Sequence, residues 1–216
     1  MQPLGLENIN MLPTPEMKKS LAYMHQKWPG QDKSEERDHM YREPLIAESD
    51  AEKKAIFNSG GAGCYAKPSE YVQVLAALLN DGKSPKTGAQ ILKPETVETM
   101  WENQIKNQPD FARQGVPAAK PEQTNPLPEL YPQEGEVPHD PNIVRWLTLL
   151  AGNPPQGWGL SFMLTQEPGP TGRGRNTAWW AGIANLFWWC DREKGVAGMI
   201  ASQVMPFGDM NVLGTW

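Results

Sequence analysis

Apolar residues at helical spacing predict three helices in the first half of the chain. After Pro68, apolar residues recur three or four positions apart until Asn80-Asp81-Gly82, and this spacing predicts a helix over 68–79. A shorter helix over 94–101 also opens with a proline. Thr14 followed by proline is a typical helix start, so a third helix is predicted over 15–27. The charged stretch 31–54 shows no such pattern, which indicates a loop or a surface helix.

The second half of the chain has the pattern of strands. Residues 157–164 predict one strand, and residues 184–190 and 196–202 predict a hairpin around a polar turn at 191–195. The second arm of this hairpin is apolar on both faces. A strand of that kind needs cover on both sides, so we expect helices to sandwich the sheet.

A proline-rich stretch separates the two halves. It contains eight prolines in the 33 residues from 109 to 141, a density that prevents regular structure. We therefore predict a long extended loop over 105–156.

Composition narrows the classes of function. The net charge is −5 and lysines and arginines are not clustered, which argues against nucleic acid as a partner. The N-terminus lacks the apolar region of a secretory signal, and no apolar stretch is long enough to cross a bilayer. Cys64 and Cys190 are isolated, which is typical of free thiols in a reducing compartment. We expect a cytoplasmic protein without a membrane association, a metal or a cofactor.

Tryptophans are concentrated near the C-terminus. Four of the nine lie within the eleven positions 179–189. We predict a tight bend at Trp180, Ala181 and Gly182, where exposed backbone would lie beside indole rings. Such a place suits an acyl or aromatic ligand.

Several segments, in the right order, resemble the fungal branch of the serine β-lactamase-related family. That branch includes esterases, transesterases and the acyltransferases of statin-type pathways. The resemblance implies an α/β fold of the β-lactamase/transpeptidase kind, an antiparallel sheet flanked by helices. The segments that carry it read PLGLENINMLPTPEM, FNSGGAGCYAKPSEYVQVLAALLNDG, ILKPETVETMW, GWGLSFML and the tryptophan-rich block through PFGD.

The resemblance also implies where a substrate would bind. Trp180, Ala181 and Gly182 stand where the family carries a Lys/His-Thr/Ser-Gly or Trp-Gly-Gly box, which the resemblance implies to lie on an edge strand that lines the cleft. The backbone N–H of Ile183 would then be one oxyanion-hole donor, an interaction worth about 3 kcal/mol in the transition state. Gly61 would lie in a turn near the cleft, although a glycine-permitted tight turn explains it equally well.

Two motifs of the family are missing from the chain. No serine is followed three positions later by lysine, and no tyrosine is followed two positions later by asparagine or serine. These motifs supply the nucleophile and help to move its proton. In the family both lie before the segment that residues 3–17 resemble. Residues 1–216 are therefore expected to be the C-terminal part of one domain, without its first strands and most of its helical lobe.

One segment within the proline-rich stretch departs from the family pattern. Residues 137–152 lie between two segments that are almost adjacent in the family. A retained intron accounts for them, because their possible codons include splice-site and branch-point sequences. A short helix accounts for them as well, since the apolar residues of 143–150 fit one face. Both explanations stay open.

The resemblance implies a serine hydrolase or acyltransferase that acts on an ester or thioester through an acyl-serine. The chain alone is predicted to be inactive. Two alternatives stay open, a non-catalytic binding protein and an interaction subunit that associates through an exposed sheet edge. The sequence Lys86-Thr87-Gly88 spells a family motif in a polar stretch after a helix, so we predict an ordinary surface turn there.

Overall fold

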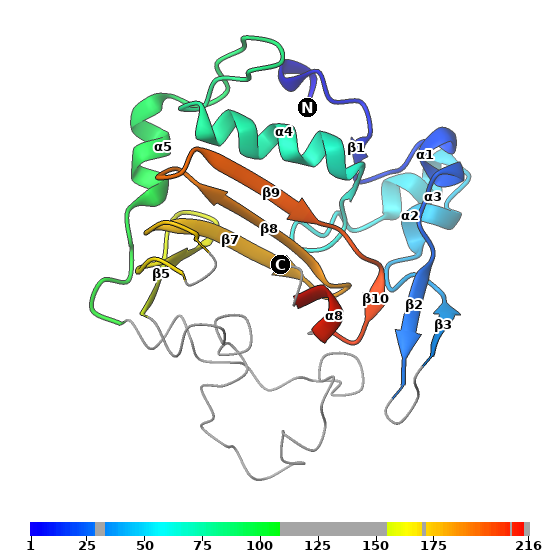
Figure 1. The fold of residues 1–216 in the computed structure, drawn as a ribbon. Helices are drawn as coiled ribbons and strands as arrows, with labels where there is room; N and C mark the ends of the chain where they lie inside the picture. The colour runs from blue at the N-terminus through cyan, green and yellow to red at the C-terminus, as the bar shows by residue number, and fades with distance from the viewer. Residues whose placement is uncertain (29–32, 109–154, 170–171, 208, 214–216) are drawn as a thin grey trace.

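The computed structural model describes residues 1–28, 33–108, 155–169, 172–207 and 209–213 (Figure 1). Most of the proline-rich stretch, and with it the segment 137–152, lies outside these residues. The predictions made for that segment therefore stay predictions.

The centre of the molecule is a five-stranded antiparallel sheet in the order β5-β6-β7-β8-β9. All neighbours in it are consecutive along the chain, so short turns are sufficient to connect most of them. Trp179 on β7 is paired with Trp189 on β8, and the adjacent Trp180 with Trp188. The strands are β5 (Gln156–Trp158), β6 (Met163–Thr165), β7 (Thr177–Gly182), β8 (Leu186–Asp191) and β9 (Val196–Ile200).

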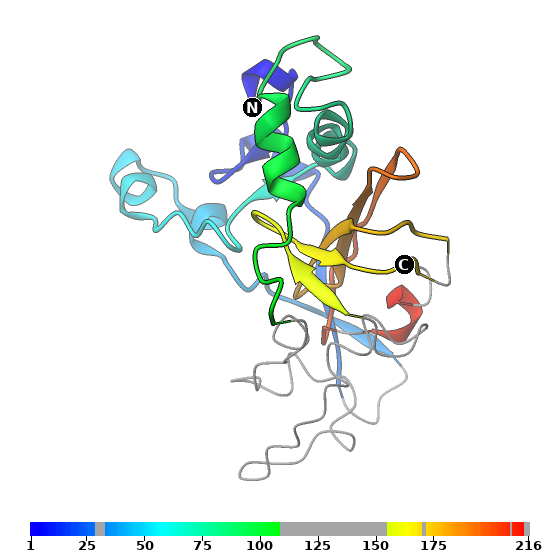
Figure 2. The same ribbon diagram turned by 90° about the vertical axis from the view of Figure 1, so that its left-hand side faces the viewer.

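Two helices cover one face of this sheet, and both were predicted from the sequence. They are α4 (Pro68–Leu79) and α5 (Pro94–Trp101), each with a proline in its first turn. The short helix α8 (Met210–Leu213) lies on the other side of the sheet (Figure 2). The sheet flanked by helices is thus confirmed. The buried core between α4, α5 and the sheet contains Leu78, Val97, Trp101, Phe162, Leu164, Ala178 and Cys190.

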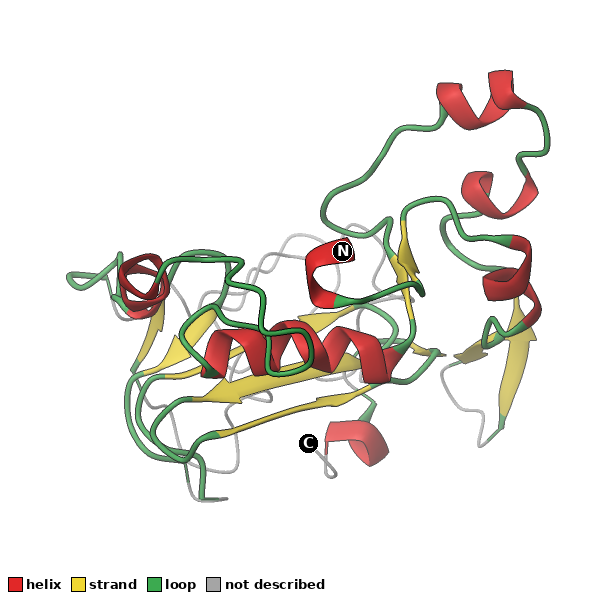
Figure 3. Ribbon diagram, turned by 90° about the horizontal axis from the view of Figure 1, so that it is seen from above, coloured by secondary structure: helices red, strands yellow, loops and turns green. Residues whose placement is uncertain are grey.

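Two small sheets and four short helices make up the rest of the described chain (Figure 3). The three-stranded sheet pairs β2 in parallel with β10 and antiparallel with β3, and the two-stranded sheet pairs β1 with β4. These strands are β1 (Ile9–Asn10), β2 (Met24–Lys27), β3 (Ser34–Arg37), β4 (Tyr65–Ala66) and β10 (Val204–Met205). The helices are η1 (Gln2–Leu4), α1 (Pro15–Lys19), α2 (Glu43–Ile46) and α3 (Asp50–Ala55).

The helix predicted over 15–27 is wrong in its second half. Its start is correct, since the Thr14 hydroxyl accepts a hydrogen bond from the Met17 N–H, but the helix ends at Lys19. Residues 24–27 form β2 instead, with Met24 and Gln26 buried on one side. Pairing with two neighbouring strands satisfies this backbone and overrides its local helix propensity.

The single strand predicted over 157–164 is also wrong. The chain turns after Trp158, where the Gly159 N–H donates to the Phe162 carbonyl at 3.0 Å, and returns as β6. Close packing accounts for the glycine, because a Cβ at Gly159 would come within 2.1 Å of the Met100 carbonyl oxygen. The sequence pattern did not predict this turn, because apolar residues lie on both sides of it.

The bend predicted at 180–182 lies three residues further along the chain, at 183–185. Trp180, Ala181 and Gly182 continue β7 and pair with β8, and the turn that follows is formed by residues 183–185. Asn185 has a φ of 58° there, a left-handed conformation that asparagine tolerates. The expected edge strand is also wrong, because β7 is the middle strand of the five-stranded sheet. The described helices include none that is long and apolar enough to cross a membrane.

Candidate functional site

The end of β7 presents an exposed indole at the edge of a tryptophan cluster. Trp180 is 43% exposed; β8 pairs with β7 at this residue, whereas the pairing with β6 ends at Trp179. The ring centroid of Trp180 lies 4.9 Å from that of Trp158 and 6.4 Å from that of Trp179. Trp179 is buried, so it supports the cluster from within the core. Trp180 therefore offers an apolar surface that a flat or extended ligand can contact.

The turn after β7 places an unused backbone donor close to this indole in sequence. Ile183 is 36% exposed, and its N–H donates no hydrogen bond to any described residue. Ala181 and Gly182 before it are partly buried and paired with Phe187 and Leu186. The four predicted residues thus lie together at one end of β7.

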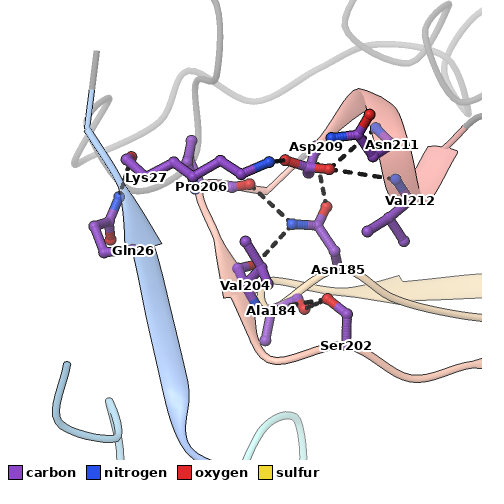
Figure 4. Close-up of polar contacts among 10 residues, drawn as sticks. All are labelled: Gln26, Lys27, Ala184, Asn185, Ser202, Val204, Pro206, Asp209, Asn211 and Val212. Carbon is purple, nitrogen blue, oxygen red and sulfur yellow. Dashed lines mark hydrogen bonds and ion pairs between the residues drawn. The ribbon is translucent and has the colours of Figure 1, made fainter. Parts of the chain in front are cut away.

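Asn185 fixes the shape of this turn, as Figure 4 shows. Its side chain is fully buried, and its Nδ2 donates to the carbonyls of Val204 at 2.7 Å and Pro206 at 2.9 Å. Its Oδ1 accepts from the Asp209 N–H at 3.0 Å. One amide therefore satisfies three backbone groups of the segment that follows the sheet.

Two further contacts hold the same region. The Ser202 hydroxyl donates to the Ala184 carbonyl at 2.7 Å, within the turn itself. Asp209 forms an ion pair with Lys27 of β2 and accepts hydrogen bonds from the N–H groups of Asn211 and Val212 in α8 (Figure 4). These contacts connect the turn that contains Ile183 to α8 and to the three-stranded sheet.

Sequence reasoning did not single out Asn185, Ser202 or Asp209. A signal was available for the first, because asparagine between two strands is typical of a tight turn. Its partners at 204–209 are distant from the tryptophan-rich hairpin turn, so only the fold brings them together.

The candidate site contains no ionisable side chain between Trp180 and Ile183. Cys190 on β8 is buried in the core of the sheet, and burial raises the pKa of its thiol to about 12. Such a thiol is protonated and unreactive at neutral pH. Desolvation likewise raises the pKa of Tyr65 to about 12, so its phenol stays protonated at neutral pH. The candidate site at the end of β7 therefore supplies an apolar surface and a hydrogen-bond donor rather than acid–base chemistry.

Two other sequence features lie outside this site. Gly61 is exposed in a turn over 59–63, and no hydrogen bond or ring contact among the described residues links it to Trp180. Its substrate-binding role remains a prediction. Lys86 and Thr87 donate hydrogen bonds to the carbonyls of Gly5 at 2.7 Å and Pro3 at 2.6 Å. They fasten the N-terminal segment, as expected of a structural turn.

Comparison with known proteins shows which acyltransferases and hydrolases the chain is similar to. The chain is 28% identical over 156 residues to the acyltransferase CalJ of Penicillium decumbens, a match that covers 71% of this chain. Its structure superposes on simvastatin synthase (LovD) from Aspergillus terreus with a TM-score of 0.69, at 17% identity and over 99% of this chain. The resemblance to the serine β-lactamase-related acyltransferases and esterases is confirmed. No family model matches the chain.

Other solved structures share the fold at greater distance. The chain superposes on EstCE1, a hydrolase with promiscuous acyltransferase activity, with a TM-score of 0.62 at 16% identity over 99% of its length. A penicillin-binding protein homologue from Caulobacter crescentus gives a TM-score of 0.52 at 14% identity over 98% of this chain. The chain spans 30% of the length of the curated acyltransferase and 45–47% of these three solved structures.

Within the described residues, no group of three or more His, Cys, Asp or Glu side chains is placed to bind a metal.

Proposed function

We propose that the end of β7 is the acyl-binding wall of a serine hydrolase or acyltransferase site. In this proposal the acyl chain of an ester or thioester lies against Trp180, and its carbonyl oxygen points to the Ile183 N–H. The proposal rests on an exposed indole followed, three residues later, by an N–H that has no hydrogen-bond acceptor among the described residues. The acyltransferase and hydrolase named above support the choice of an acyl ligand.

The 216 residues contain neither Ser-x-x-Lys nor Tyr-x-Asn/Ser. We therefore propose that this chain binds the acyl group without cleaving it, and that the nucleophilic serine has to come from residues outside this sequence. A single backbone donor gives only part of an oxyanion hole, because such sites need the reacting atom positioned as well.

Binding can be tested with a thioester of N-acetylcysteamine carrying a butanoyl or longer acyl group. We expect saturable quenching of tryptophan fluorescence, with an affinity that falls about tenfold in Trp180→Ala because most of the apolar contact is removed. Trp28→Ala is the matched control, since Trp28 is 40% exposed but lies on the chain after β2. Equal weakening by both substitutions, or no binding at all, would refute the site.

The backbone donor needs a separate pair of variants. Ile183→Pro removes the N–H, whereas Ile183→Ala keeps it and removes most of the side chain. Loss of one hydrogen bond of about 1 kcal/mol predicts about fivefold weaker binding in the proline variant alone. Circular dichroism would establish that the turn variant is folded.

Catalysis is tested with p-nitrophenyl esters and a serine-directed phosphonate. The expected outcome is no hydrolysis above the rate in buffer. Hydrolysis that the phosphonate abolishes would show that the chain carries its own nucleophile, and the binding-only proposal would then be wrong.

A further inference from the structure

Trp158 on β5 is held in place by the chain that follows α5, which runs beside β5 (Figure 2). The Trp158 N–H donates to the Asn103 side-chain oxygen at 3.2 Å, and the Trp158 carbonyl accepts from the Gln104 N–H at 2.7 Å. Gly157 permits this close approach, because a Cβ there would lie within 2.6 Å of the Asn103 side chain. The backbone of Trp158 therefore has neighbours on both sides, β6 on one and this chain on the other.

The indole of Trp158 connects a core cluster to the candidate site. It packs against buried Met163 and Trp179, together with Ile105. Its ring centroid also lies 4.9 Å from that of Trp180, with the two ring planes inclined by 55°. This distance and tilt are typical of a favourable aromatic pair. Trp158 is thus fixed from the core side and contacts the exposed indole on the other.

Trp180 itself has fewer restraints than Trp158. It is 43% exposed, and β8 alone pairs with β7 at this residue. A side chain that exposed samples several staggered rotamers unless a neighbour selects one of them. The ring contacts of Trp180 among the described residues are with Trp158 and with the adjacent Trp179. Trp158 is therefore the neighbour distant in sequence that selects the orientation of the Trp180 indole.

We propose that Trp158 is a positioning residue of the acyl site, which holds Trp180 in the orientation that the acyl chain packs against. This inference rests on the proposed function of Trp180. A wall that is ordered before the ligand arrives binds more tightly, because the ligand does not have to order it. Loss of Trp158 therefore weakens acyl binding although Trp158 itself does not touch the ligand.

A double-mutant cycle tests this role, with the affinity for the butanoyl thioester of N-acetylcysteamine measured by isothermal titration calorimetry. Trp158→Leu should weaken binding about fivefold, because the ligand then has to order the Trp180 side chain. In the Trp180→Ala background the same substitution should change the affinity less than about twofold. Trp158→Phe keeps an aromatic ring and should restore binding to within about twofold of the wild type. Equal weakening in both backgrounds would overturn the positioning role.

Near-UV circular dichroism tests the contact between the two rings without a ligand, because it reports the fixed packing of aromatic side chains. The spectral changes caused by Trp158→Leu and Trp180→Ala should not add in the double variant, since either substitution removes the same ring pair. Trp28→Ala is the matched control. Trp28 is 40% exposed and has no ring contact with Trp180 among the described residues, so its spectral change should add to that of Trp158→Leu and binding should not change.

Loss of stability needs its own control. Val97→Ala shortens a buried side chain in the core beside α5 and should leave acyl binding unchanged. Weaker binding in this variant, or additive spectra for Trp158→Leu and Trp180→Ala, would overturn the proposal. Non-additive spectra from a wild type that binds no thioester would keep the ring contact but refute the proposed function, and with it any role of Trp158 in acyl binding.

Discussion

The two edge strands of the central sheet differ in how their outer backbone groups are satisfied. At β5, the Trp158 N–H donates to the Asn103 side chain at 3.2 Å, and the Trp158 carbonyl accepts from the Gln104 N–H at 2.7 Å. At β9, none of the described residues makes a corresponding contact. The same sheet therefore ends in one capped edge and one open edge.

The contrast shows that sheet formation and edge protection are separate tasks. Both strands lie in the same antiparallel sheet and each includes a glycine. Only β5 has a neighbouring loop with the right side chain beside it. An apolar strand edge that no other strand covers is a template for further pairing.

The largest expected effect comes from filling the glycine of the open strand. A Cβ at Gly198 would come within 2.4 Å of the Trp189 ring, so Gly198→Val should lower the free energy of unfolding by up to about 3 kcal/mol. Val196→Ala on the same strand is the control and should change it by less than about 0.5 kcal/mol. Urea unfolding followed by circular dichroism measures both. Equal stability of the two variants would mean that Trp189 does not lie over Gly198.

A somewhat smaller effect is expected at the turn between β7 and β8. Asn185→Ala leaves two buried carbonyls and one N–H without their partner, which should cost about 2 kcal/mol. Ser202→Ala is the graded comparison, because it removes a single hydrogen bond of the same turn, to the Ala184 carbonyl, and should cost about 1 kcal/mol. Binding of the acyl thioester should weaken along with stability if the turn positions Ile183. Unchanged binding would mean that Asn185 stabilises the fold but does not position Ile183 for the ligand.

Opening the capped edge should have a smaller effect again. Asn103→Ala removes the acceptor for the Trp158 and Ile105 N–H groups and should cost about 1 kcal/mol. Amide hydrogen exchange at Trp158 should accelerate, because its N–H loses its partner. Thr99→Ala on α5 serves as the control for a nearby polar truncation. If exchange at Trp158 does not change, Asn103 does not cap β5.

The smallest expected effect concerns thiol reactivity, which tests whether β9 stays paired with β8 and requires no change in stability. Cys190 lies on β8, next to β9, with its thiol buried and its pKa raised to about 12, whereas Cys64 is exposed. Ellman's reagent should titrate one thiol in the native protein and both in guanidinium chloride. Cys64→Ser should abolish the native reaction. Rapid reaction of Cys190 would mean that β9 separates from the sheet in solution.

Local sequence signals were sufficient for several elements of the fold. Proline at the start and Asn-Asp-Gly at the end delimit α4, and the polar turn before Gly195 separates β8 from β9. In each case neighbouring residues determine the backbone conformation, through capping, turn geometry or alternation. At 180–182 the local pattern was wrong, because it predicted a bend where β7 continues, and only the family resemblance had implied a strand there.

Only the tertiary structure decided the remaining features. Residues 24–27 continue a helical start in sequence, but become a strand because β3 and β10 satisfy their backbone. The turn at Gly159 forms because α5 packs close to it, and Asn185 meets its partners through the path of the chain after β9. Exposure of Trp180 and burial of Trp179 follow from neighbours on other strands. These properties depend on residues distant in sequence, which a local pattern does not contain.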